Sequence, residues 1–434
     1  MYSTEFIDKL KAEAEEIALI DRKKYKEYIQ IAEQYAVDNN LIVCGKSATR
    51  ILLNEYDFDS MNYHFFADVA DVFKLAKLLY KVDPTGISCY TTVITDLPGR
   101  LYSIVINCRK LFQFTVLPTY RGINTFDLLI PTMRPSRYLE DKLECIGPEL
   151  QLIPIYQTLC NPALAGEWVE NIKLETKMRK IFRAEFQEKM KIILGGGSDG
   201  KKIVALMSGS HYPTHFQKKF LTVVREKFMV AKDRVAVGQV AISKILGREI
   251  TGAEKLQVIS ADLKADGDEL EGLGKIMNMV VTWRIDDPKI PTHPRLRRLT
   301  AYYENDHETN GVASKTPFIN IYNAAEFDLI PFIRGTVGTP YLIMYYRLID
   351  MWTVNILYKL KIIKKEYAQQ LLVEMFHSFG EISDHLDSIL GATEVDTEVI
   401  LPKTSYVGEA EDAGLALKRV KTTKFVPPVL VARM

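Results

Sequence analysis

The sequence is poor in the residues that build disulfide frameworks and zinc sites. Its 434 residues include only five cysteines and seven histidines. An odd number of widely spaced cysteines, without a CxxC pair or a Cys/His cluster, predicts reduced thiols in a cytosol-like compartment. These five cysteines are Cys44, Cys89, Cys108, Cys145 and Cys160.

Long apolar runs and an excess of one charge are also missing. No apolar stretch reaches the ~20 residues that a membrane-spanning helix requires. Residues 1–40 form a charged amphipathic pattern without a signal-peptide core. The 56 basic and 55 acidic side chains leave a net charge of +1, so a polyanion could bind only at a local patch. We therefore expect a soluble cytoplasmic protein with no membrane partner.

The composition is that of a globular protein with large cores. Hydrophobic residues make up 47% of the chain and charged residues 26%, and the length predicts two to three domains. Within residues 42–66 the stretch IVCGKSATRILLNEYDFDSMNYHFF predicts a strand, a glycine turn, a short helix and a second strand. The chain therefore belongs to a mixed α/β (α+β) class.

An internal repeat is the strongest sign of domain organisation. The segment that starts at Gly45 aligns without a gap with the segment that starts at Gly238, at an offset of 193 residues. In this alignment YHFFA (63–67) lies on LQVIS (256–260), and an apolar strand precedes each glycine. Agreement in order, spacing and turn glycine predicts a duplication.

The repeat predicts the boundaries of five segments. They are an N-terminal helical segment 1–40, a first lobe 41–193, a degenerate second lobe 194–335, C-terminal helices 336–391 and a tail 392–434.

The acids that follow the first glycine turn resemble the pattern of polymerase-β-type nucleotidyltransferases. In that pattern a strand, a glycine turn and a helix precede Asp-x-Asp, and here ten residues separate Lys46 from Asp57. Acids at positions i and i+2 of a strand point to the same side, so Asp57 and Asp59 can together hold a divalent metal ion. On this interpretation the two acids are catalytic metal ligands, and Gly45, Lys46 and Ser47 bind the ATP phosphates.

Three longer blocks extend the resemblance beyond this motif. GKSATRILL, ELQLIPIYQTLCNPALAGEW and FINIYNAAEFDLIPF…PYLIMYYRLIDMWTVNILYKL are similar to the poly(A) polymerases of nucleocytoplasmic large DNA viruses. The likeness is to the giant-virus type, which has two nucleotidyltransferase-like lobes. It implies untemplated addition of AMP from ATP to mRNA 3′ ends, with Mg²⁺ or Mn²⁺ as cofactor. It also implies an mRNA partner, a homodimer, and a location in the host cytoplasm with packaging in the virion.

The sequence departs from the family pattern at the metal ligands. In a second register NYHFF (62–66) aligns with the family's Asp-x-Asp-Phe-Phe-Ser segment, so that Asn62 and His64 replace the acids. Gln113 stands where the third carboxylate is expected, and the second lobe has no Asp-x-Asp. The alternative function is therefore a catalytically inactive RNA-binding scaffold or processivity partner of the same family.

A basic and aromatic segment is the candidate RNA-binding site. KIPTHPRLRRLTAYY (289–303) combines cations that can contact phosphates with tyrosine rings that can stack on bases. The predicted RNA-binding residues are Lys289, Arg295, Arg297, Arg298 and Tyr302.

Overall fold

A computed structural model describes most of the chain in two compact units. The first unit is Met1–Gln151 with Ile290–Thr292, and the second is Leu152–Lys289 with His293–Met434. The division falls inside helix α5 (Pro148–Cys160), whereas we expected the first lobe to end at residue 193. The described residues are 8–9, 12, 25–53, 63–82, 87–94, 99–106, 109–116, 132–133, 143–193, 215–229, 234–250, 256–260, 262–286, 297–304, 315–323, 330–333, 337–390 and 405–407.

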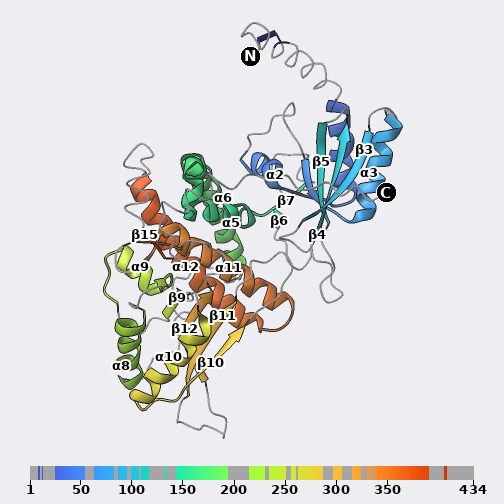
Figure 1. The fold of residues 1–434 in the computed structure, drawn as a ribbon. Helices are drawn as coiled ribbons and strands as arrows, with labels where there is room; N and C mark the ends of the chain where they lie inside the picture. The colour runs from blue at the N-terminus through green and yellow to red at the C-terminus, as the bar shows by residue number, and fades with distance from the viewer. Residues whose placement is uncertain are drawn as a thin grey trace. The chain divides into compact units, whose positions relative to one another are not determined.

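The first unit is built on a seven-stranded mixed sheet with the strand order β3-β4-β5-β2-β1-β7-β6 (Figure 1). Its strands are β1 (Ile42–Cys44), β2 (Tyr63–Phe66), β3 (Ile87–Ile94), β4 (Gly99–Ile106), β5 (Arg109–Val116), β6 (Thr132–Met133) and β7 (Glu144–Ile146). A helix over residues 25–38, α2 (Gly45–Leu52) and α3 (Val69–Val82) accompany the sheet. Helix α3 buries Val72, Leu75 and Leu79, whose spacing of three to four residues places them on one face.

The second unit is built on an eight-stranded mixed sheet with the order β10-β11-β12-β9-β8-β14-β13-β15. Its last strand comes from the segment that we expected to form a tail. The strands are β8 (Val235–Ala236), β9 (Leu256–Ser260), β10 (Val281–Asp286), β11 (Arg298–Glu304), β12 (Lys315–Asn323), β13 (Ile330–Ile333), β14 (Val337–Gly338) and β15 (Ser405–Val407).

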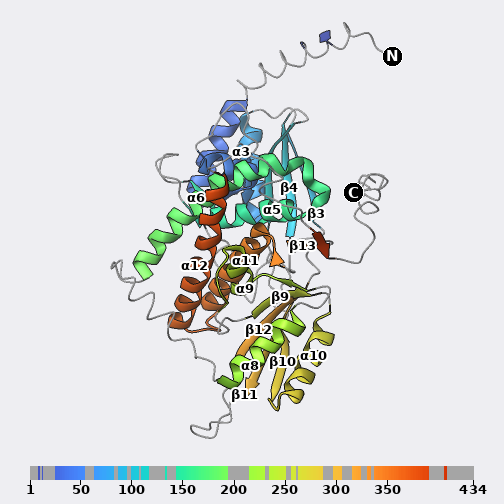
Figure 2. The same ribbon diagram turned by 90° about the vertical axis from the view of Figure 1, so that its left-hand side faces the viewer.

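Helices flank this second sheet. Helix α10 lies along β10 and β11 (Figure 2), and its Gly267 lies directly against the ring of Trp283. Helix α11 buries nearly its whole length, which explains its apolar and aromatic sequence. The helices are α5 (Pro148–Cys160), η3 (Pro162–Glu167), α6 (Trp168–Ile193), α8 (His215–Val223), the π-helical turn η4 (Val224–Phe228), α9 (Gln239–Ile245), α10 (Leu263–Ile276), α11 (Pro340–Lys359) and α12 (Lys365–Leu390).

The two sheets repeat the same topology, strand for strand. Strands β3, β4, β5, β2, β1, β7 and β6 correspond in order and pairing sense to β10, β11, β12, β9, β8, β14 and β13. Val43 pairs with Phe65 in the first sheet, and Ala236 pairs with Val258 in the second. Both pairs differ by 193 residues (236 − 43 and 258 − 65), the offset of the sequence repeat. The expected α+β fold with duplicated lobes is therefore confirmed.

Within the described ranges, no helix combines the length and the apolar character needed to cross a membrane.

Candidate nucleotidyltransferase site

The turn between β1 and α2 requires a glycine. Gly45 has a φ of +61°, in the left-handed region that L side chains rarely adopt. A Cβ atom at this position would lie 3.2 Å from Nδ1 of His64. The backbone of the turn therefore passes close to the His64 side chain on β2.

Hydrogen bonds fix this turn from three sides. The Ser47 hydroxyl donates to the carbonyl of Cys44 at 2.9 Å and accepts from the His64 backbone N–H at 3.2 Å. The Gln151 amide, on α5, donates to the carbonyl of Gly45 at 3.3 Å. The Ser47 hydroxyl is thus buried and engaged within the protein, whereas Lys46 is exposed. Of the three predicted phosphate-binding residues, Lys46 offers the accessible side chain.

The strand that pairs with β1 is YHFF, the second of the two registers that the sequence left open. His64 pairs with Cys44, directly before the glycine turn. Asp57, Asp59 and Asn62 lie outside the described residues. The described β2 side chain beside the Gly45 turn is therefore the imidazole of His64. In the second register, His64 stands at the position of the second acid of Asp-x-Asp.

The third ligand position lies on β5, which runs parallel to β2. Gln113 is the register partner of His64, so an amide occupies the position of the third carboxylate. The imidazole Nε2 of His64 lies 2.8 Å from the Thr115 hydroxyl. Among the residues that the structure describes, no group of three or more His, Cys, Asp or Glu side chains is placed to hold a metal ion.

The thiols beside this site are buried and unsuited to nucleophilic chemistry. Burial, followed by the neighbouring Cys145, raises the pKa of the Cys44 thiol well above its usual range. Burial, followed by the charge of Glu144, raises the pKa of Cys145 to about 12. Thiols with raised pKa values carry little thiolate at neutral pH.

The equivalent turn in the second lobe is closed by its own side chains. A Cβ at Gly238 would lie 2.7 Å from Cβ of Gln257, the residue that corresponds to His64. The Gln257 amide donates to the Tyr322 hydroxyl at 2.9 Å, and this hydroxyl donates to Asp350 on α11 at 2.7 Å. Asp350 is only 2% exposed. A buried hydrogen-bond chain therefore occupies the position beside the Gly238 turn.

Three of the five predicted RNA-binding residues lie within the described part of the chain. Lys289 and Arg295 lie outside the described residues, whereas Arg297 is exposed directly before β11. Arg298 and Tyr302 lie on β11. Arg298 faces the Asp350 carboxylate, with Nη1 4.0 Å from Oδ1.

Sequence reasoning missed one member of this region, Arg284 on β10. Its guanidinium carbon lies 5.5 Å from the centre of the Tyr302 ring. The alternation of TWRID (282–286) could have indicated a strand with Arg284 on one face. The pairing of β10 with β11, which brings the two residues together, is not visible in sequence.

Comparisons with known proteins place the chain beside viral proteins. No protein-family model matches the sequence. It is 26% identical over 424 residues to "Uncharacterized protein K421R" of a Pretoriuskop tick isolate of African swine fever virus, covering 94% of this chain and 92% of that protein. For the same-named protein of a Malawi tick isolate, the identity is 25% over 426 residues, with 95% and 94% covered.

A solved structure defines the fold. The crystal structure of the Megavirus polyadenylate synthase matches with a TM-score of 0.59 and 13% sequence identity, covering 97% of this chain and 83% of that one. The chain thus has the two-lobe α+β fold found in a viral polyadenylate synthase.

Proposed function

We propose that this chain is an RNA-binding, non-catalytic member of the polyadenylation machinery, built on the fold of a polyadenylate synthase. The observation that carries the proposal is the register of β2. It puts His64 beside the Gly45 turn and Gln113 opposite it on β5, where the nucleotidyltransferase pattern requires carboxylates. Both lobes have the same sheet topology. At the two described positions where the nucleotidyltransferase pattern has acids, the residues are His64 and Gln113.

The chemistry of these side chains supports the proposal. Mg²⁺ prefers oxygen ligands, above all carboxylates and phosphates, and a two-metal site needs several of them within ~4 Å. An imidazole next to a threonine hydroxyl and a neutral amide bring no negative charge to the edge of the sheet. The described residues therefore do not fit a pair of divalent ions. The exposed cation of Lys46 can still attract an RNA or nucleotide phosphate.

A second candidate function is metal-dependent poly(A) polymerase activity, with transfer of AMP from ATP to an RNA 3′ end. Two observations favour it: the ten-residue spacing between Lys46 and Asp57 and the left-handed glycine at the turn. In this version Asp57 and Asp59 supply the carboxylates for Mg²⁺ or Mn²⁺. Gly45 and Lys46 then bind the triphosphate.

Extension of a labelled RNA separates the two functions. Purified protein is incubated with ATP, Mg²⁺ or Mn²⁺ and a labelled oligoribonucleotide, beside the double variant Asp57→Asn/Asp59→Asn, and RNA binding is measured on the same samples. We expect RNA binding without extension. Extension by the wild type that the double variant loses would establish the polymerase instead. Absence of both extension and RNA binding would refute the proposal.

A further inference from the structure

Two arginines and two tyrosines gather on the outer strands of the second sheet and the start of α12. We call these four residues the β10–β11 patch; they are Arg284, Arg298, Tyr302 and Tyr367. The side chain of Arg284 is 67% exposed, that of Arg298 is 30% exposed, and Tyr367 is 50% exposed. Cations and exposed aromatic rings of this kind bind single-stranded nucleic acids by phosphate contact and base stacking.

The strand register puts the two arginines on one face of the sheet. Arg284 pairs with Thr300 on β11, and Arg298, two residues before Thr300, therefore points to the same side. The opposite face is packed, because Leu299 and Tyr303 on β11 are buried. The patch thus lies on the face that α10 does not cover.

Helix α11 covers the neighbouring strand of this same face and reaches the patch at Arg298. Its Asp350 accepts a hydrogen bond from Tyr322 on β12, the register partner of Arg298. Asp350 also contacts Arg347 at 3.1 Å and faces Arg298 at 4.0 Å. Asp350 is therefore a positioning residue that holds the Arg298 guanidinium at the edge of the covered area.

The aromatic members lie within reach of the arginines. The guanidinium carbon of Arg284 is 5.5 Å from the centre of the Tyr302 ring, a cation–π distance. Tyr367 lies near both Arg298 and Tyr302: burial and then Glu374 raise its pKa, while Arg298 lowers it and Tyr302 raises it. Rings held beside cations in this way are available to stack on unpaired bases.

The acid beside Arg284 forms a weak, exposed ion pair with it. The Arg284 guanidinium is 3.4 Å from Asp286, but these side chains are 67% and 38% exposed, and such surface pairs contribute little. A phosphate can therefore replace Asp286 as the partner of Arg284. The charge of Asp350 is shared between Arg298 and Arg347.

Comparison of the lobes shows that these cations are particular to the second one. Through the paired registers, Arg284 and Arg298 correspond to Tyr90 and Leu101 in the first lobe. The first sheet thus has neither cation at these positions. A difference confined to one copy of a duplicated fold indicates a role that the fold itself does not require.

We propose that the β10–β11 patch is a binding site for single-stranded RNA. Arg284 and Arg298 contact consecutive phosphates, and Tyr302 and Tyr367 stack on the bases. The proposal rests on the RNA partner of the proposed function and assigns the place where the RNA lies on the second lobe.

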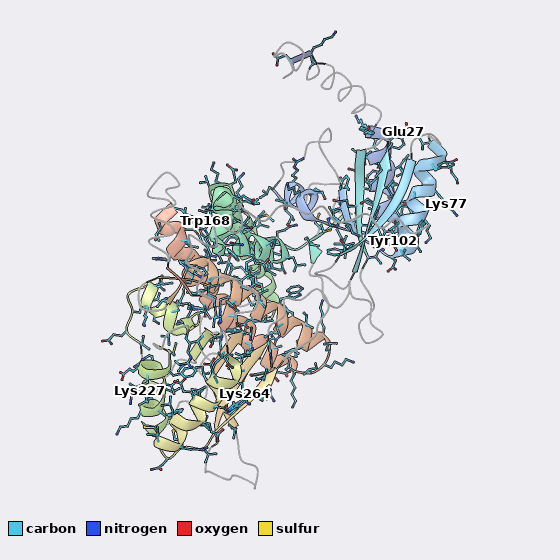
Figure 3. All side chains as sticks on the ribbon, in the orientation of Figure 1. Glu27, Lys77, Tyr102, Trp168, Lys227 and Lys264 are labelled. Carbon is cyan, nitrogen blue, oxygen red and sulfur yellow. The ribbon has the colours of Figure 1, made fainter. Side chains whose placement is uncertain are left out.

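The test is fluorescence anisotropy of the full chain with a labelled single-stranded oligoribonucleotide, measured over a range of salt concentrations. The variants are Arg284→Gln, at a side chain that is 67% exposed, and Tyr367→Leu, at a residue that is 50% exposed. The matched control is Lys264→Gln, which removes one exposed charge on α10 (Figure 3). Unlabelled double-stranded RNA and single-stranded DNA serve as competing ligands.

The two variants should weaken binding in different ways. Arg284→Gln should reduce the slope of log Kd against log salt by about 0.7, the value for one phosphate contact with a single strand. Tyr367→Leu should raise Kd by ~5- to 150-fold at constant slope, as loss of one stacked base does. Lys264→Gln should bind as the wild type does, and double-stranded RNA should compete poorly.

Two results would overturn the inference, and they differ in what they say about the proposed function. Wild-type affinity in both Arg284→Gln and Tyr367→Leu would place the RNA elsewhere and leave the proposed function standing. Failure of the wild-type protein to bind single-stranded RNA would refute the patch and the proposed function together.

Discussion

His64 on β2 and Gln257 on β9 occupy the same position in the two lobes. Each lies beside the glycine turn of its own lobe. Each side chain also forms a hydrogen bond with the hydroxyl group of the residue two positions after its register partner, on β5 in the first lobe and on β12 in the second. The hydroxyls belong to Thr115 in the first lobe and Tyr322 in the second. At this position both lobes thus carry a hydrogen-bonding side chain that is not a carboxylate.

The Gly45 turn gives the first prediction. Gly45→Ala should destabilise the protein by more than the ~1–2 kcal/mol that a left-handed alanine costs, because the new methyl group meets the His64 ring at 3.2 Å. Gly247→Ala is the matched control, since Gly247 has a φ of +65° and nothing within 4 Å of its Cβ position. Thermal unfolding of the two variants measures the difference. Equal losses would show that the His64 contact carries no cost.

The buried chain of the second lobe gives a second prediction. Asp350→Asn should lower the free energy of unfolding by roughly 1–3 kcal/mol, because it weakens bonds to Tyr322 and Arg347. A double-mutant cycle with Tyr322→Phe should give a coupling energy of about 0.5–3 kcal/mol. Asp268→Asn, at an exposed position on α10, is the control and should change stability by less than ~0.5 kcal/mol. Additive effects of Asp350→Asn and Tyr322→Phe would show that the hydrogen bond between these two residues contributes no coupling energy.

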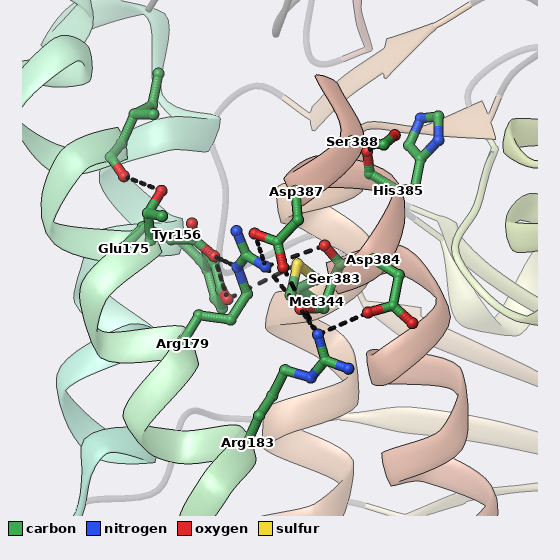
Figure 4. A network of polar contacts seen from close by, with 12 residues as sticks. Tyr156, Glu175, Arg179, Arg183, Met344, Ser383, Asp384, His385, Asp387 and Ser388 are labelled. Carbon is green, nitrogen blue, oxygen red and sulfur yellow. Dashed lines mark hydrogen bonds and ion pairs between the residues drawn. The ribbon is translucent and has the colours of Figure 1, made fainter. Parts of the chain in front are cut away.

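A third prediction concerns the charged network that joins α6 to α12 (Figure 4). Arg179, with a side chain that is 0% exposed, bonds Glu175 at 2.7 Å and pairs with Asp387 at 2.9 Å. Arg179→Met should cost roughly 3–5 kcal/mol, because it leaves Glu175 buried without its counter-charge. Arg183→Met is the control. The Asp384 partner of Arg183 is 69% exposed, so its loss should cost at most ~1 kcal/mol. Urea unfolding of the two variants measures both losses of stability. Similar unfolding midpoints would contradict the prediction that Arg179→Met is the more destabilising variant.

The buried thiols give a fourth prediction, which depends on pH. Burial raises the pKa values of Cys44, Cys145 and Cys160, so at pH 8 the reactive thiolate is scarce in the folded state. Iodoacetamide should label these three residues far more slowly in native than in unfolded protein, and the native rate should still rise above pH 9. Mass spectrometry of the peptides measures the rates. Fast native labelling of Cys44 would show that the first sheet opens readily.

The sequence predicted the features that local patterns determine. The ungapped match from Gly45 to Gly238 anticipated two sheets with the same register offset. The pattern of strand, glycine turn and short helix in residues 42–66 anticipated β1 and α2. These signals are carried by neighbouring residues and by a periodicity that one chain displays.

Features that depend on distant pairing could not be predicted in this way. The choice between the two registers of β2 depends on which residue pairs with Cys44, and the structure selects His64. The assignment of α6 to the second unit depends on contacts such as that of Arg179 with Ser383, which lies 204 residues farther along the chain. Arg284 joins Tyr302 only through the pairing of β10 and β11.

The most direct test of the central claim is Mn²⁺ binding followed by electron paramagnetic resonance. The wild-type chain should show no tight Mn²⁺ site, because His64 and Gln113 stand at the ligand positions. The variant Asn62→Asp/His64→Asp/Gln113→Asp, which places carboxylates at all three positions, should gain one. A tight site in the wild type that disappears in Asp57→Asn/Asp59→Asn would contradict the account and identify those two acids as the metal ligands.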